Sequence, residues 1–172
     1  MENIKKKHKR VFVMCGPAGA GKSTWVIKQM APITDVYISR DNIRFMLLKE
    51  NDDYFAKENQ VKKMFYDAIA NATSEGDWEN IFVDATHLTT TARFKTLMNI
   101  ASGVEIIAVS FEVPIETAIE RNNQRVGRAL VPEKAIRNMY ASYKIPALYE
   151  GFNEIWHIDA EGNIIKERGS NE

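Results

Sequence analysis

The stretch GPAGAGKST, residues 16–24, decides how this chain folds. It fits the pattern G-x-x-x-x-G-K-[S/T], whose fixed positions here are Gly16, Gly21, Lys22 and Ser23. A short apolar run, residues 11–15, comes directly before the glycines, and a segment of helical composition, residues 22–30, follows them. Because a phosphate-binding loop lies between a strand and a helix, this context favours such a loop over a glycine-rich turn that binds nothing.

The residues of the loop indicate how it would hold a nucleoside triphosphate. Glycines let successive backbone N–H groups converge on phosphate oxygens, and the helix N-terminus adds a partial positive charge. Lys22 is expected to reach the β- and γ-phosphates, and the Ser23 hydroxyl to ligate Mg²⁺. The residues expected to bind the triphosphate and its metal are Gly16, Gly19, Gly21, Lys22, Ser23 and Thr24.

Length and composition exclude several classes of protein. The chain has 172 residues, which suits a single domain spanning residues 1–172. Its 23 Lys and Arg residues balance its 23 Asp and Glu residues, which argues against a protein that coats nucleic acid along a basic face. Its apolar runs are far shorter than the roughly 18 residues that a membrane-spanning helix needs, so no membrane partner is expected.

The start of the chain and its cysteine content indicate a compartment. The first ten residues are basic, but the apolar run after them is too short for a secretory signal. We interpret residues 1–10 as a solvated flank, with a weak nucleic-acid contact as the alternative. The single cysteine, Cys15, cannot form an internal disulfide, so we expect a cytoplasmic protein. The basic residues of this flank are Lys5, Lys6, Lys7, Lys9 and Arg10.

The rest of the chain alternates between short β-prone runs and helical segments. Strands are expected at residues 11–15, 36–38, 81–84, 104–111 and 155–158, the last continuing into a terminal strand or hairpin near residues 164–165. Helices are expected at residues 22–30, 41–49, 55–72, 89–101, 115–123 and 132–143. This alternation predicts an α/β fold, with a mostly parallel central sheet of about five strands and helices on both faces.

Two polar residues after the second strand are candidates for chemistry on an acceptor. Asp41 and Arg44 stand near the carboxyl end of that strand and share one face of a helical turn. A carboxylate there could accept a proton from an attacking hydroxyl, while a guanidinium holds a phosphate of the acceptor. The alternative is that Asp41 caps the helix and Arg44 pairs with a surface carboxylate.

Two further groups complete the candidate site. Asp84 ends the third apolar strand and is expected to have a partner, because an unpartnered buried carboxylate is costly. A polar, glycine-containing stretch at about residues 121–131 suits a mobile lid that delivers an arginine to the transferring phosphoryl group. The alternative is that its arginines are solvated helix-end residues. The three arginines are Arg121, Arg125 and Arg128.

Taken in order, several segments resemble the polynucleotide 5′-hydroxyl kinases of phage and bacterial nucleic-acid repair, a family of P-loop kinases. The segments are GPAGAGKSTW, SRDNIR, FVDATHL, RNNQR and VPEKAIRNMYASY, and the likeness covers residues 10–145. The resemblance implies transfer of the γ-phosphate of ATP, with Mg²⁺, to the 5′-hydroxyl end of RNA or DNA. It implies that Asp41 is the general base, that Lys22 serves the ATP phosphates, and that Arg44 grips the phosphate beside the acceptor nucleoside.

The resemblance also assigns the remaining residues. Asp84 and Thr86 would support the acceptor side of the site, and Arg125 would contact the donor phosphates and act in catalysis. His87 stands where relatives often have asparagine, and we assign it no chemistry. The segment IDAEGN lacks the second aspartate of a D-x-D-G-T phosphatase motif, so no 3′-phosphatase activity is expected.

Other functions remain open from the sequence. The acceptor could be a small hydroxyl compound, namely a nucleoside, a sugar, an antibiotic or a peptidoglycan precursor, or the chain could be a nucleotide-binding regulatory ATPase. A separate RNA or DNA ligase, or a phosphatase, would act in the same pathway as a polynucleotide kinase. The preference for RNA or DNA, for single-stranded or duplex ends and for the donor purine, together with the oligomeric state, is not decided by these residues.

Overall fold

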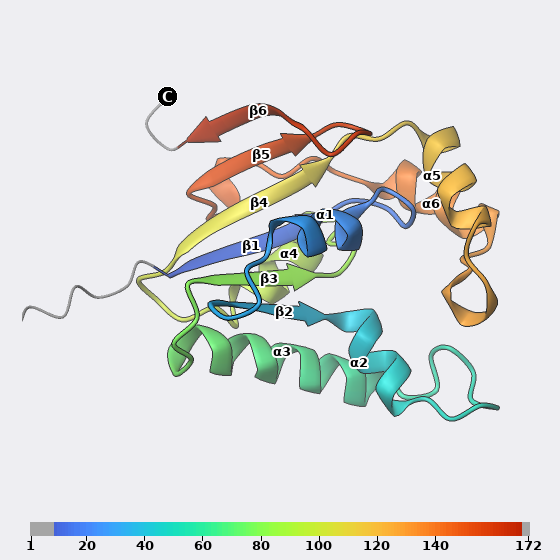
Figure 1. The fold of residues 1–172 in the computed structure, drawn as a ribbon, viewed down its shortest axis with the longest axis horizontal. Coiled ribbons are helices and arrows are strands. Elements are labelled where there is room, and N and C mark those ends of the chain that lie inside the picture. Colours follow the sequence, from blue (N-terminus) through green and yellow to red (C-terminus); the bar gives the residue numbers. More distant parts are fainter. Residues whose placement is uncertain (1–8, 170–172) are drawn as a thin grey trace, which may run out of the picture.

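Residues 9–169, which the computed structural model describes, contain one sheet of six strands (Figure 1). The strands are β1 (Arg10–Cys15), β2 (Asp35–Ser39), β3 (Asn80–Asp84), β4 (Glu105–Phe111), β5 (Glu154–Ile158) and β6 (Ile164–Gly169). Their order in the sheet is β2-β3-β1-β4-β5-β6, and all neighbours are parallel except β5 and β6. The predicted α/β fold with a mostly parallel sheet is therefore confirmed.

Helices cover both faces of this sheet. They are α1 (Lys22–Gln29), α2 (Arg40–Leu47), α3 (Glu58–Ser74), α4 (Thr90–Leu97), α5 (Ile115–Asn123) and α6 (Glu133–Ser142). On one face, apolar residues of α3 such as Phe65 and Ile69 pack with Val11 and Val13 of β1. On the other face, Trp25 and Val26 of α1 pack in a second cluster with Phe12 and Met14 of β1.

The central strand shows why this arrangement follows from the sequence. Successive residues of a strand point to opposite faces, so a strand covered by helices on both sides must be apolar throughout. All five residues from Val11 to Cys15 are buried, with relative exposures of 3% or less. The uninterrupted apolar run before the glycines therefore predicts both the strand and its central place in the sheet.

The structure differs from the sequence prediction in the length of several elements, and α4 ends at Leu97 where residue 101 was expected. The sheet has six strands among the described residues, where about five were expected. The sixth strand, β6, is the terminal strand or hairpin expected near residues 164–165, and it runs on to Gly169 as the antiparallel partner of β5. The third helix begins at Glu58 and not at residue 55, because a turn precedes it in which the N–H of Glu58 donates to the carbonyl of Phe55. Phe55, where the helix was expected to begin, lies in this turn and is 67% exposed.

Two residues of the basic flank lie within the described part of the chain. The Lys9 ammonium donates to the carbonyls of Ala72, Thr73 and Gly76 at 2.6–3.2 Å, so it neutralises the C-terminal end of α3. Arg10 donates to Asn80 Oδ1 at 3.0 Å. The other lysines of the flank, at positions 5–7, fall outside the described residues. Among residues 9–169, no helix is both long enough and apolar enough to cross a membrane.

Candidate active site

The glycine-rich loop joins β1 to α1 at the carboxyl ends of the parallel strands (Figure 1). Gly19 has φ +80°, and a Cβ there would lie 2.2 Å from the Ala118 carbonyl oxygen. Gly21 precedes α1 with φ +97°, a conformation that L side chains rarely adopt. No side chain caps the first amides of α1, so these N–H groups can bind an anion. The loop therefore fits the phosphates of a nucleotide.

Lys22 is the first residue of α1 and is 9% exposed. Its ammonium donates to the carbonyl oxygens of Gly16 at 2.8 Å and Pro17 at 2.7 Å, which holds it over the loop. Burial lowers the pKa of Lys22, and the nearby negative charges of Asp84 and Asp41 act in the opposite direction. The ammonium is therefore held beside the loop amides that would bind phosphate.

Asp84 has the partners that its position at the end of β3 requires. The Ser23 hydroxyl donates to Asp84 Oδ2 at 2.7 Å, and the Tyr37 hydroxyl donates to the same oxygen. Burial, followed by the charge of Asp84, raises the pKa of Tyr37, so this phenol stays a donor at neutral pH. Asp84 thus accepts hydrogen bonds from Ser23 of the loop and from Tyr37. The sequence motifs do not indicate Tyr37 as a partner. Ser23 and Asp84 supply the oxygen donors that Mg²⁺ prefers.

Asp41 lies in the first turn of α2, directly after β2. Ser39, and not Asp41, caps this helix, since its Oγ accepts from the Asn42 amide at 3.3 Å. Asp41 Oδ1 accepts from Arg44 at 2.6 Å and from the Tyr54 hydroxyl at 2.7 Å. The Asp41 side chain remains 62% exposed, so the carboxylate is oriented by two donors and still reachable by a substrate.

Arg44 is held by the protein itself. Its side chain is 5% exposed, and its Nη2 donates to Glu58 Oε2 at 2.6 Å. Its guanidinium also lies over the Tyr54 ring, 4.4 Å from the ring centre. These contacts favour a role for Arg44 in orienting Asp41, and contact with an acceptor phosphate stays a prediction. No sequence motif indicates Tyr54 or Glu58, because Tyr54 lies before α3 and Glu58 lies in its first turn, away from the recognisable segments.

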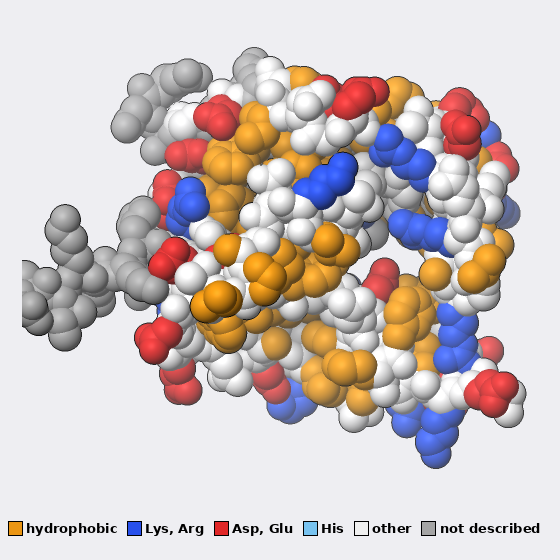
Figure 2. Space-filling view, viewed as in Figure 1, with side chains coloured by type: hydrophobic (Ala, Val, Ile, Leu, Met, Phe, Trp, Pro, Cys, Tyr) orange, Lys and Arg blue, Asp and Glu red, His pale blue; other side chains and the backbone are white. Residues whose placement is uncertain are grey.

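Most of the predicted side chains line one cavity of about 470 Å³. In Figure 2 it is the hollow between α2 and the α5–α6 segment, with basic side chains above it and acidic and hydrophobic ones below. The predicted site residues that line it are Lys22, Ser23, Asp41, Arg44, Asp84, Thr86 and Arg125. Gly21 and Thr24 line a second cavity, of about 300 Å³, together with Arg121 and residues 159–162.

The segment expected to form a lid begins inside α5, since residues 121–123 are helical, and its remainder connects α5 to α6 and contains a short 3-10 helix, Gly127–Ala129. The buried Asn122 side chain closes this segment with two hydrogen bonds to the backbone of Val131, at 2.7 and 3.0 Å. These bonds replace the backbone pairing that an irregular segment lacks. The base of this segment is thus fixed, while residues 123–127 are exposed.

The three arginines of this segment have different surroundings. Arg121 donates to the Ala160 carbonyl at 2.5 Å, beside the second cavity. Arg128 donates to the carbonyls of Lys49 and Glu50 just beyond α2. Arg125 lines the cavity of Lys22 and Asp41, and no side-chain hydrogen bond or ion pair joins it to another residue in the range 9–169. Of the three, Arg125 is therefore the one whose charge is free for a ligand.

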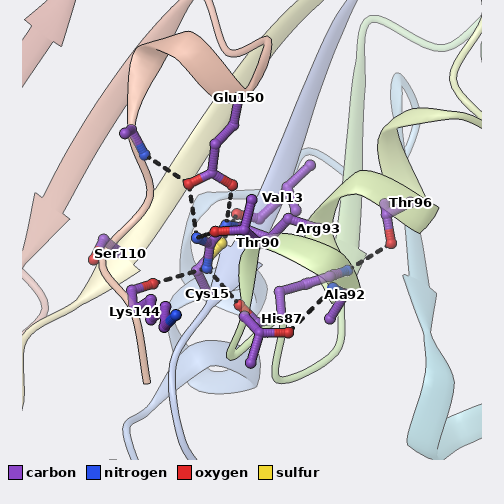
Figure 3. Close-up of polar contacts among 12 residues, drawn as sticks. Val13, Cys15, His87, Thr90, Ala92, Arg93, Thr96, Ser110, Lys144 and Glu150 are labelled. Atoms are coloured by element: carbon purple, nitrogen blue, oxygen red, sulfur yellow. Dashed lines mark hydrogen bonds and ion pairs between the residues drawn. The ribbon is translucent and has the colours of Figure 1, made fainter. Parts of the chain in front are cut away.

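His87 lies in the loop that follows β3 and is buried, and Figure 3 shows its contact with Thr96. Its Nδ1 contacts the Met14 carbonyl at 2.7 Å, so Nδ1 carries the proton and donates. Its Nε2 then accepts from the Thr96 hydroxyl at 2.9 Å. Burial lowers the pKa of His87 from 6.5 to about 4. The histidine is a neutral structural link between β1 and α4, which agrees with giving it no chemistry.

The buried neutral histidine predicts a pH dependence of stability. The unfolded state binds a proton near pH 6.5 and the folded state only near pH 4, so stability is complete above pH 6.5 and falls between these values as the pH is lowered. We expect this group to contribute on the order of 3 kcal/mol to that loss. Urea unfolding between pH 7 and 4 measures it by comparing wild type with His87→Asn, since asparagine tolerates the φ of +43° here. Parallel pH profiles would contradict the assignment.

Arg93 and Glu150 form a buried ion pair next to His87 (Figure 3). Arg93 Nε and Nη2 each donate to a different carboxylate oxygen of Glu150 at 2.7 Å. Arg93 Nη1 donates to the carbonyls of His87 at 2.9 Å and Lys144 at 2.8 Å. The guanidinium thus joins α4 to the loop after β3 and to the segment that follows α6. The side chains of Arg93 and Glu150 are 0% and 3% exposed, so water could not replace either partner if the other were removed.

Glu150→Gln is expected to lower the free energy of unfolding by about 3–5 kcal/mol, because it leaves the Arg93 charge buried without a counter-charge. Urea denaturation at pH 7 provides the measurement. Glu133→Gln is the matched control, because Glu133 pairs with the exposed Arg137 and its loss should leave stability unchanged. Equal, small effects of both substitutions would show that the buried pair does not stabilise the fold.

Comparisons with known proteins agree with this architecture. A sequence profile of a family described as AAA domain matches residues 11–146. The search of curated proteins found no match. A chain of a Pnkp1/Rnl/Hen1 RNA repair complex is similar in structure, with a TM-score of 0.65 and 20% identity, over 83% of this chain and 46% of that one.

Two other solved structures have similar folds. One belongs to the PezAT chromosomal toxin–antitoxin system of Streptococcus pneumoniae, with a TM-score of 0.68 and 16% identity, over 94% of this chain and 72% of that one. The other is a gluconokinase from Sinorhizobium meliloti 1021, with a TM-score of 0.60 and 17% identity, over 92% and 86%. The present chain spans less than half of the RNA repair chains that it matches. At these identities the likeness is one of fold.

Proposed function

The chain belongs to the AAA domain family and has a P-loop kinase-like fold, and from this premise we propose that it transfers the γ-phosphate of ATP to the 5′-hydroxyl end of RNA or DNA. The observation that carries the proposal is that Lys22 and Asp41 line the same cavity. They are close enough for the Asp41 charge to act on the pKa of Lys22. A basic group for the donor phosphates and a carboxylate for the acceptor hydroxyl are thus brought to one place.

The donor side consists of the loop, Lys22, Ser23 and Arg125. The loop amides and the Lys22 ammonium bind the β- and γ-phosphates of ATP, and the exposed Arg125 neutralises charge that develops on the transferring group. Ser23 and Asp84 would hold Mg²⁺, which supplies charge neutralisation to the phosphates when it is bound. The second cavity, beside Thr24 and Arg121, leaves room for the nucleoside of the donor.

The acceptor side consists of Asp41 and the groups that orient it. Asp41 accepts the proton of the 5′-hydroxyl as that oxygen attacks the γ-phosphorus, and the bond from phosphorus to the β,γ-bridging oxygen of ATP breaks, which leaves ADP. Arg44 and Tyr54 hold the carboxylate at Oδ1. The zero net charge is compatible with an enzyme of chain ends, which needs few phosphate contacts.

A nucleic-acid acceptor is supported by the resemblance of the SRDNIR and FVDATHL segments to polynucleotide kinases and by the fold shared with a chain of an RNA repair complex. A ligase or a phosphatase acting on the same ends would then be a functional partner. The cytoplasm suits such a role. The small-molecule alternative has its own support, because the chain covers 86% of a gluconokinase.

The deciding experiment offers γ-labelled ATP and Mg²⁺ with 5′-hydroxyl oligonucleotides of RNA and DNA, and in parallel with gluconate and nucleosides. We expect label on the oligonucleotides and none on the small acceptors. The reverse result would favour the small-molecule kinase. ATP binding without transfer to any acceptor would favour a regulatory ATPase.

A further inference from the structure

Three aromatic side chains stand on the acceptor side of the site, and we call Phe45, Tyr54 and Phe55 the aromatic rim. All three line the larger cavity together with Asp41. Phe55 is 67% exposed and Phe45 is 39% exposed. Hydrophobic side chains are visible on this lower wall of the hollow in Figure 2. Exposed aromatic surface at a polar site indicates a ligand that covers it.

The rim is fixed relative to the Asp41 carboxylate. Tyr54 donates to Asp41 Oδ1 at 2.7 Å, and the Arg44 guanidinium covers its ring at 4.4 Å. The Phe55 ring meets the Tyr54 ring edge-on, with centres 4.9 Å apart, and the Phe45 ring does so at 6.3 Å. Tyr54 therefore anchors two exposed rings beside the group that we propose as the general base.

Resting on the proposed function, we propose that the aromatic rim stacks against the nucleobase of the acceptor's terminal nucleotide. In a terminal nucleoside, the base and the 5′-hydroxyl are attached to the same sugar. When the hydroxyl contacts Asp41, the base therefore lies one sugar ring away, in the part of the cavity that the aromatic rim lines. Base–aromatic stacking tolerates any sequence, because every base has a π-face.

The charge of the protein makes this contact important for affinity. With 23 basic and 23 acidic residues, the chain has no excess charge to attract a long phosphate backbone. Arg44, which would otherwise bind a phosphate, is engaged with Asp41 and Glu58. Stacking then supplies binding that depends on the terminal base and responds weakly to salt.

The test compares two acceptors, a 5′-hydroxyl oligonucleotide and the same oligonucleotide with an abasic 5′-terminal residue. Phe55→Ala should raise KM for the first acceptor by about 5- to 150-fold. It should leave KM for the abasic acceptor unchanged, and Phe55→Trp should restore the wild-type value. Phe94→Ala is the matched control, since Phe94 is 57% exposed on α4 and does not line the cavity.

The outcomes separate this inference from the proposed function. If the wild type phosphorylates both acceptors with the same KM, the rim does not read the base, and the kinase assignment stands. The same holds if Phe55→Ala and Phe94→Ala behave alike. If the wild type labels neither acceptor, the proposed function fails and the inference fails with it.

Discussion

Replacing Arg125 with alanine is expected to lower kcat for phosphoryl transfer by about 10³- to 10⁵-fold. Arg125 lines the cavity of Lys22 and Asp41, and its guanidinium has no partner among residues 9–169. Its charge is therefore available to the transferring phosphoryl group, where it stabilises the transition state more than the bound ATP. Single-turnover transfer from γ-labelled ATP at saturating acceptor measures the effect on chemistry.

Three further substitutions sharpen this prediction. Arg125→Lys should recover part of the rate, because lysine keeps the charge and loses the planar fork. Arg128→Ala should lose less than Arg125→Ala, since Arg128 already binds the carbonyls of Lys49 and Glu50. Arg137→Ala, on the exposed surface of α6, should retain wild-type activity. A larger loss with Arg128→Ala than with Arg125→Ala would show that the wrong lid arginine has been assigned.

Asp41→Asn is expected to lower kcat by about 10²- to 10⁴-fold while KM for the acceptor changes little. Asparagine keeps an oxygen that can accept from Arg44 and Tyr54, so the local geometry is retained while the proton acceptor is lost. Steady-state kinetics with a 5′-hydroxyl oligonucleotide separates the two parameters.

The matched control for this substitution is Asp67→Asn. Asp67 is an exposed carboxylate on α3 that pairs with Lys63 one helical turn away. It should leave both kcat and KM at their wild-type values. A change confined to KM with Asp41→Asn would assign this carboxylate to binding and remove it from proton transfer.

The features that could be predicted from the sequence are those encoded by neighbouring residues. The apolar run of β1, the glycines and Lys22 are contiguous, so the strand, the loop and the helix follow from one another. The alternation of β-prone and helical segments along the chain likewise predicted the mostly parallel sheet. Asp41 could be proposed because it comes directly after a strand, where ligands bind in α/β sheets.

The features that could not be predicted depend on pairs of residues far apart in the chain. Glu58 meets Arg44 only because α3 packs against α2, and Glu150 meets Arg93 across 57 positions. Phe55 shares the spacing of the buried residues of α3, so its pattern predicts burial, while the turn before Glu58 directs it to the cavity. Spacing along the sequence does not contain this tertiary information.

The central claim is that the Lys22 ammonium and the Asp41 carboxylate act on the two ends of one phosphoryl transfer. The most direct measurement is a crystal structure with a non-hydrolysable ATP analogue, Mg²⁺ and a short 5′-hydroxyl oligonucleotide. The account predicts that Lys22 contacts the β- or γ-phosphate and that an Asp41 oxygen lies about 2.6–3.2 Å from the 5′-hydroxyl. A 5′-hydroxyl bound away from Asp41, or phosphates bound away from Lys22, would contradict it.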